Sequence, residues 1–136
     1  LRAGWTPQQL FQQLYALAQC YDMVANYSRQ YNITYLTFVR ARSDTQIWNW
    51  KGFTFEDAQK KIIIPANKGY GGVNDRWAIG PFKYMEVYMR RYYRMGDKDV
   101  TNLHAETFLK YILNREKVPY KLVPIENAEV VRKKKK

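Results

Sequence analysis

The first quarter of the chain carries a stripe of mainly apolar residues at alternating steps of four and three. The stripe consists of Leu10, Leu14, Leu17, Tyr21, Val24, Ser28 and Tyr31. Because this spacing keeps one face of an α-helix apolar, it predicts a long amphipathic helix over residues 7–31. Thr6 and Gln9 form a capping-box pattern and Pro7 suits the first helical position, so we expect the helix to begin there.

Glutamine fills the polar side of this predicted helix. No charged residue occurs from Ala3 to Tyr21, and the polar positions are Gln8, Gln9, Gln12, Gln13 and Gln19. A solvent-exposed helix usually carries lysine and glutamate, whereas an uncharged amide costs less than a charge to remove from water. We therefore expect Gln8, Gln12 and Gln19 to lie in an interface with another protein.

The next segment changes to residue types that favour strands. Residues 33–40, ITYLTFVR, are mainly β-branched and aromatic, which predicts a strand buried on both faces. A second strand is expected at residues 45–50, and the polar residues 41–44 would turn between the two to give a small β-hairpin. An alternative is that the first helix continues through this region.

A short helix and a long connection are expected in the middle of the chain. Thr54 and Asp57 give a second capping-box-like start, and the helix would span residues 55–62 and end in the β-branched run before Pro65. The glycines in residues 66–80 suggest a phosphate-binding loop, but no Lys-Ser or Lys-Thr pair follows them. We therefore expect a surface loop that presents Tyr70 and Trp77 to a partner.

Residues 81–96, PFKYMEVYMRRYYRMG, predict one helix that begins at a proline and ends at a glycine. Its apolar side would consist of Phe82, Met85, Tyr88 or Met89, Tyr92 and Met95. Glu86 stands four residues before Arg90 and can pair with it, which would leave Arg91 and Arg94 free to bind an anion. Arg91 and Arg94 are therefore the specific candidates for contact with an anionic partner, and Arg90 beside them completes the set of candidate contacts.

The rest of the chain predicts one more helix and an extended arm. The helix should run from Asp99 or Thr101 to Asn114 and pack beside the helix of residues 81–96. Residues 118–136 contain two prolines and no helical stripe, and they would form an arm outside a basic domain of residues 1–117. Further anion contacts are expected from the basic end, which consists of Lys133, Lys134, Lys135 and Lys136. The expected fold class is α+β, mainly helical.

Charge and composition favour an anionic partner and many protein contacts. The net charge is +11, of which residues 51–136 contribute +9 from 19 basic and 10 acidic side chains. A basic balance of this size attracts RNA, DNA or an acidic lipid surface. Aromatic residues make up 16% of the chain, and the amphipathic tyrosines among them suit half-buried interface positions.

Catalytic and metal-binding chemistry has few residues to draw on. The chain has one cysteine, Cys20, and one histidine, His104. This count excludes an internal disulfide and leaves little for a zinc site or a nucleophilic triad. We therefore expect neither an enzyme nor a cofactor. No run of eighteen apolar residues occurs, so no transmembrane helix is expected.

Two functions remain from these features. The first is a structural subunit of a ribonucleoprotein, of ribosomal or organellar ribosomal type, that contacts RNA phosphates and neighbouring proteins. The alternative is an accessory or adaptor subunit of a large protein complex, such as an organellar respiratory or ATP synthase complex or a viral particle. The chain begins at Leu1 without an initiator methionine, which suggests a processed or trimmed amino terminus. The sequence leaves the compartment open, and a mitochondrial or other organellar assembly is the expectation.

Overall fold

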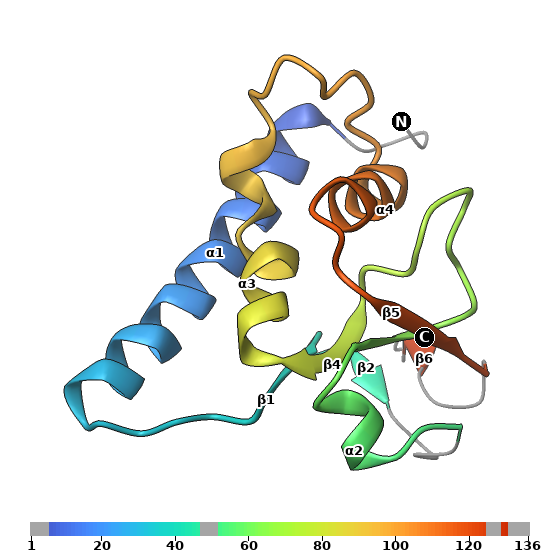
Figure 1. Ribbon diagram of the computed structural model, residues 1–136. Coiled ribbons are helices and arrows are strands. Elements are labelled where there is room, and N and C mark those ends of the chain that lie inside the picture. The colour runs from blue at the N-terminus through green and yellow to red at the C-terminus, as the bar shows by residue number, and fades with distance from the viewer. Residues whose placement is uncertain (1–5, 47–51, 125–128, 131–136) are drawn as a thin grey trace, which may run out of the picture.

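The protein is an α+β fold, as the sequence predicts, and it is built around a four-stranded mixed sheet in place of the small β-hairpin that was expected (Figure 1). The computed structural model describes residues 6–46, 52–124 and 129–130. In the order β1-β4-β3-β5, the strands are Thr37–Ala41, Trp77–Pro81, Ile62–Pro65 and Tyr120–Val123. The pairs β1–β4 and β4–β3 are antiparallel, whereas β3 and β5 are parallel.

Helices cover both faces of this sheet unequally. They are α1 (Pro7–Gln30), α2 (Phe55–Ala58), α3 (Phe82–Met89), the 3₁₀ turn η1 (Arg91–Arg94) and α4 (Ala105–Arg115). Residues of α1, α3 and α4 share the larger core with the sheet, whereas Ala58 of α2 belongs to a smaller core with Phe53 packed against it. The sheet therefore has a thick helical layer on one face and a thin layer on the other.

Alternation along the two central strands separates the two cores. Successive side chains of a strand point to opposite faces of a sheet. Ile62 and Ile64 of β3 join the larger core, whereas Ile63 joins the smaller one. On β4, Ala78 faces the larger core and Trp77 faces the smaller core. Both central strands are thus buried on both sides, which explains their nearly continuous apolar sequences.

The first helix matches its prediction closely. Thr6 and Gln9 form the expected capping box, and the helix ends at Gln30. Its buried residues are Leu10, Leu14, Leu17, Ala18, Tyr21 and Ala25. The predicted stripe is therefore right as far as Tyr21. The Tyr21 hydroxyl donates a hydrogen bond to the Phe82 carbonyl at 3.0 Å, and this bond joins α1 to the start of α3.

The predicted β-hairpin is wrong. The strand β1 pairs with β4, in a register that places Val39 opposite Ile79. Residues Thr45–Gln46 form β2, which pairs with β6 (Glu129–Val130) in a separate two-stranded sheet. The rest of the predicted second strand, residues 47–50, lies outside the described residues. Side-chain types predict a strand here but contain no information on which distant segment completes its ladder.

Two further segments differ from their predictions. The run Ile62–Pro65 forms the central strand β3, where a helix end was expected, because the sheet supplies partners on both sides. Residues 81–96 do not form one helix: α3 ends at Met89 and a 3₁₀ turn follows at Arg91–Arg94. The tighter 3₁₀ turn changes the direction of each side chain relative to an α-helix.

The extended arm expected from residue 118 is also corrected in part. Val118 is buried, and Tyr120–Val123 form the strand β5 in parallel with β3. These residues are extended, as predicted, but they belong to the sheet. None of the helices in the described part of the chain combines the length and apolar character needed to cross a bilayer.

Candidate interaction surface

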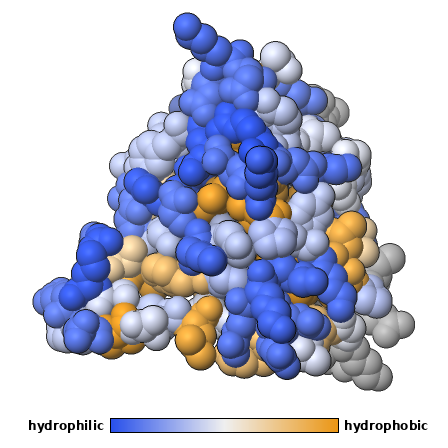
Figure 2. Space-filling view, viewed as in Figure 1, coloured by the Kyte–Doolittle hydropathy of each residue, from blue (hydrophilic) through white to orange (hydrophobic). Residues whose placement is uncertain are grey.

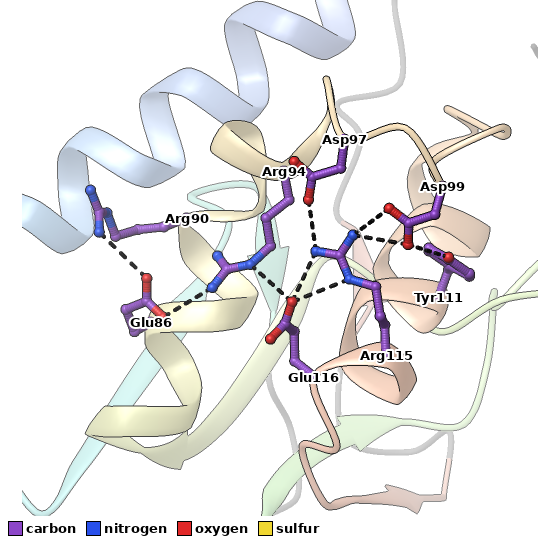
Figure 3. Close-up of polar contacts among 8 residues, drawn as sticks. All are labelled: Glu86, Arg90, Arg94, Asp97, Asp99, Tyr111, Arg115 and Glu116. Carbon is purple, nitrogen blue, oxygen red and sulfur yellow. Dashed lines mark hydrogen bonds and ion pairs between the residues drawn. The ribbon is translucent and has the colours of Figure 1, made fainter.

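Arg90 and Arg94, two of the arginines that were expected to bind an anion, are paired with carboxylates within the molecule (Figure 3). The Nε atom of Arg90 lies 3.0 Å from the Asp22 carboxylate, and its Nη1 atom lies 3.4 Å from Glu86. Arg94 pairs with Glu86 at 3.6 Å and with Glu116 at 3.5 Å. Arg90 therefore ties α3 to α1, and Arg94 ties η1 to the end of α4. An external anion would have to compete with these carboxylates.

Arg115 extends this network along the connection between η1 and α4. Its guanidinium lies 2.9 Å from Asp97, 3.0 Å from Asp99 and 2.9 Å from Glu116 (Figure 3). The Tyr111 hydroxyl also donates to Asp99. That hydrogen bond and those from Arg115 lower the pKa of Asp99 below its usual value. The network fixes the end of α4 against the connection that precedes it.

Arg91 is fully buried, so the prediction that it is free to reach a partner is wrong. Its Nη1 atom donates to the Tyr88 carbonyl, and its guanidinium lies 5.0 Å from the centre of the Tyr88 ring. Burial lowers the pKa of Arg91 and raises that of Tyr88 to about 12. The prediction that Arg94 is free to bind an anion is also wrong, because it pairs with two carboxylates of the same chain.

Of the other predicted contact residues, Tyr70 and Trp77 fall in different environments. Tyr70 is exposed, but Trp77 is only 1% exposed and lies in the smaller core. The centres of the Trp77 and Phe53 rings are 5.9 Å apart. The prediction that Trp77 meets a partner is therefore wrong. The remaining predicted anion contacts, Lys133, Lys134, Lys135 and Lys136, lie outside the described residues.

The glycine-rich loop packs closely against α4. This packing, with no bound phosphate, is sufficient to explain why one position of the loop needs glycine. A Cβ atom on Gly72 would lie 2.0 Å from the Glu106 carbonyl oxygen. The next residue, Val73, donates its N–H to that carbonyl at 3.1 Å. Gly71 has a φ of +86°, a backbone conformation that glycine adopts without strain.

The predicted glutamines lie on an exposed face of α1. Gln8, Gln12 and Gln19 are all exposed. Beside them runs a row of exposed residues at steps of four: Phe11, Tyr15, Gln19, Met23, Tyr27 and Tyr31. Residues four apart are neighbours on a helix surface, so this row is continuous and spans about 30 Å. We call it the α1 row.

No member of the α1 row is charged, and five of its six members are aromatic rings or methionine. Met23 is the most exposed, at 71%. The Tyr27 and Tyr31 rings lie 4.6 Å apart, and Tyr15 lies 5.3 Å from Tyr92 of η1. These ring contacts order the side chains before any partner binds, which lowers the entropy lost on binding.

Apolar exposure continues beyond the end of α1. Ile33, Leu36 and Val39 are 38%, 61% and 47% exposed. In the space-filling view, hydrophobic residues reach the surface at the lower left, where the chain passes from α1 to β1 (Figure 2). The α1 row was not among the predicted contacts, although its step of four lies in the sequence outside the buried stripe.

Within residues 6–46, 52–124 and 129–130, no group of three His, Cys, Asp or Glu side chains is placed to hold a metal ion. The α1 row and the glutamines beside it supply aromatic rings, a thioether and amides. Such residue types are enriched in protein interfaces, where charged residues are depleted from the centre.

A family model described as "Domain of unknown function (DUF7796)" matches residues 5–134. Neither a curated protein nor a solved structure matches the chain. Because the family model covers nearly every residue, the chain belongs to the DUF7796 family.

Proposed function

We propose that the chain is a subunit of a large assembly and that the α1 row docks against a neighbouring protein. The observation that carries this proposal is the continuous row of exposed, uncharged side chains from Phe11 to Tyr31. Isolated apolar residues are common on protein surfaces, but a contiguous row of uncharged, mainly aromatic side chains is typical of an interaction site.

The charges beside the row support the same function. Asp22 is paired with Arg90, so this carboxylate is neutralised by α3 and does not oppose an apolar partner. Arg90 and Arg94 likewise serve the internal packing of α1, α3 and α4. Charge pairing thus stabilises the helical layer, and the exposed residues of α1 are uncharged as far as Arg29 in its last turn. This division favours an accessory or adaptor subunit held by protein contacts.

Replacing Phe11 or Met23 by glutamate is expected to weaken docking about 30-fold, because a central interface residue commonly contributes about 2 kcal/mol. Both side chains are exposed, and glutamate favours helix, so the fold should be unchanged. The measurement is the fraction of the chain that stays with the native, nuclease-treated complex on size-exclusion chromatography.

A matched control is Phe55→Glu, which introduces the same charge at another exposed phenylalanine, on α2. This variant should stay with the complex as the unaltered chain does. Equal retention of Phe11→Glu, Met23→Glu and Phe55→Glu would contradict docking through the α1 row.

A ribonucleoprotein subunit is the second candidate, and the net charge of +11 favours it. If RNA is the partner, the logarithm of the binding constant for single-stranded RNA should fall with the logarithm of salt concentration by about 0.7 for each phosphate contacted. Arg94→Gln should leave this slope unchanged, since Arg94 is paired with Glu86 and Glu116. Deleting residues 133–136 should lower it by up to about 3.

Salt titration followed by fluorescence anisotropy measures these slopes. A slope near zero for the unaltered chain would remove the RNA candidate. A slope that falls after Arg94→Gln would show that the Arg94 carboxylate pairs open when RNA binds.

A further inference from the structure

The strand β1 is an edge strand with an unusually unprotected edge. It pairs with β4 on one side only, and no backbone hydrogen bond occupies its other side within the described part of the chain. Natural proteins protect sheet edges with exposed lysines, prolines, bulges or covering elements. The opposite edge, β5, shows such protection, because Lys121 is exposed and Pro124 follows the strand.

The prediction of a strand buried on both faces at residues 33–40 is wrong, because β1 covers only Thr37–Ala41 and Arg40 is its one buried residue. Residues 33–40 have the β-branched and aromatic composition of a central strand. In the structure, however, Val39 is 47% exposed, although it pairs directly with the buried Ile79. The only charged residue of the strand, Arg40, is buried and therefore does not protect the edge.

A groove of about 540 Å³ lies beside this edge. Its walls are Leu17 and Cys20 of α1, Met89 of α3, and the consecutive residues 38–44. Neighbouring residues of a strand point to opposite faces of the sheet. Residues 38–41 belong to β1, so a space that touches these four residues in succession follows the edge of the strand. The groove thus lies where the next strand of the sheet would lie.

Arg40 is a buried cation in the wall of this groove. It is 6% exposed, and its Nη1 atom donates to the Arg76 carbonyl at 3.3 Å. Its Nε atom is closed to solvent and has no hydrogen-bond partner in the described part of the chain. Arg40 therefore places a positive charge close beneath the surface of the groove.

We infer that an extended segment of another polypeptide adds to β1 as a fifth strand of the sheet. A strand edge presents alternating N–H and C=O groups, and another extended backbone complements this pattern along its whole length. The groove leaves room for its side chains beside Leu17 and Met89. The inference goes beyond docking through the α1 row, because it assigns a second contact and the backbone geometry of the partner.

Charge selects the chemistry of this segment. Arg40 and Arg42 line the groove, and Asp44 is held by Arg42 at 2.7 Å. This ion pair leaves one net positive charge at the groove, on a chain of net charge +11. The segment is therefore apolar at alternate positions and acidic at its ends. A second copy of this chain would bring the same positive charge to the edge and is disfavoured.

The test uses a synthetic seven-residue peptide, Glu-Val-Thr-Val-Thr-Val-Glu with blocked ends, added to the full chain at millimolar concentration. Hydrogen exchange of the backbone amides, followed by NMR, should slow about tenfold or more within residues 37–41. A peptide N-methylated at alternate residues along one edge cannot pair through that edge. Two such peptides, each methylated along a different edge of the peptide, distinguish strand pairing from apolar adsorption. If the peptide pairs as a strand, one of the two should leave the hydrogen exchange of residues 37–41 unchanged.

Two protein variants provide a matched comparison. Val39→Asp and Leu122→Asp change residues that are 47% and 48% exposed on the two opposite edge strands. Val39→Asp should weaken binding of the peptide about tenfold, whereas Leu122→Asp should bind the peptide with the affinity of the unaltered chain. Circular dichroism checks that both variants fold. If a variant does not fold, the comparison of the N-methylated peptides on the unaltered chain still tests the inference.

Three results would overturn the inference. They are no protection of residues 37–41 at saturating peptide, equal protection by both N-methylated peptides, and dimerisation of the chain alone that Val39→Asp abolishes. The last result would assign the edge to a second copy. If the peptide fails to bind while Phe11→Glu still releases the chain from its complex, the inference fails and docking through the α1 row stands.

Discussion

Replacing Trp77 by alanine is expected to lower the free energy of unfolding by about 3–5 kcal/mol, the range for removing a large aromatic residue from a core. Trp77 is 1% exposed on the central strand β4 and packs with Ile63, Ile79 and Phe53 in the smaller core. The thin layer on this face has few side chains that could move to fill the space. Chemical denaturation followed by far-ultraviolet circular dichroism, which reports on the backbone, measures the change in the free energy of unfolding.

Trp77→Phe is the control, because it keeps most of the apolar volume and should cost clearly less than the alanine variant. A residue that contacts a partner would behave differently from a core residue. Weakened partner binding with an unchanged free energy of unfolding would support the interface role that the sequence suggested for Trp77.

Gly72→Ala is expected to destabilise the fold by about 3 kcal/mol, at the upper end of the range for overpacking. The added Cβ atom would lie 2.0 Å from the Glu106 carbonyl oxygen and 2.4 Å from the Thr107 nitrogen. Both are backbone atoms near the start of α4, so neither can rotate away. The loop would have to separate from α4, and the Val73–Glu106 hydrogen bond would be lost.

Gly96→Ala is the matched control, since a Cβ atom there meets nothing within 4 Å. It should be neutral or stabilise the fold by up to about 1 kcal/mol, because alanine lowers the entropy of the unfolded chain. Thermal unfolding of both variants by calorimetry gives the comparison. Equal melting temperatures would show that the loop does not depend on its contact with α4.

Local sequence signals predicted several elements well. The capping boxes at Thr6 and Thr54 both form, and each is followed by a helix. At the second box, the backbone hydrogen bond from Thr54 lowers the pKa of Asp57 below its usual value. These features involve residues within one turn of each other, so they do not depend on the rest of the fold.

Pairings between distant segments were not readable in the same way. The strand β1 was expected to pair with its neighbour in sequence, but it pairs with β4, and β3 pairs with β5 across α4. The residue types in these segments favour extended structure without naming a partner. The choice depends on which pairing buries Ile62, Ile63 and Ile64 on both faces.

The arginines show a similar limit for the candidate site. Their spacing predicted the pair of Arg90 with Glu86, which lies one helical turn away. It did not predict that α3 would end at Met89, that η1 would turn Arg91 inward, or that Glu116 of a later segment would meet Arg94. Each of these depends on the break in the helix and on the position of α4.

By itself, the sequence determined the extent of α1, both capping boxes and the charge-free face on which Gln8, Gln12 and Gln19 are exposed. Short-range periodicity and capping chemistry are sufficient for these features. Only the tertiary structure decided that Trp77 and Arg91 are interior, that β1 stands at the edge of the sheet formed by the described residues, and that the α1 row faces outward. These outcomes depend on which surfaces the sheet and helices bury against one another, and burial depends on segments far apart in the chain.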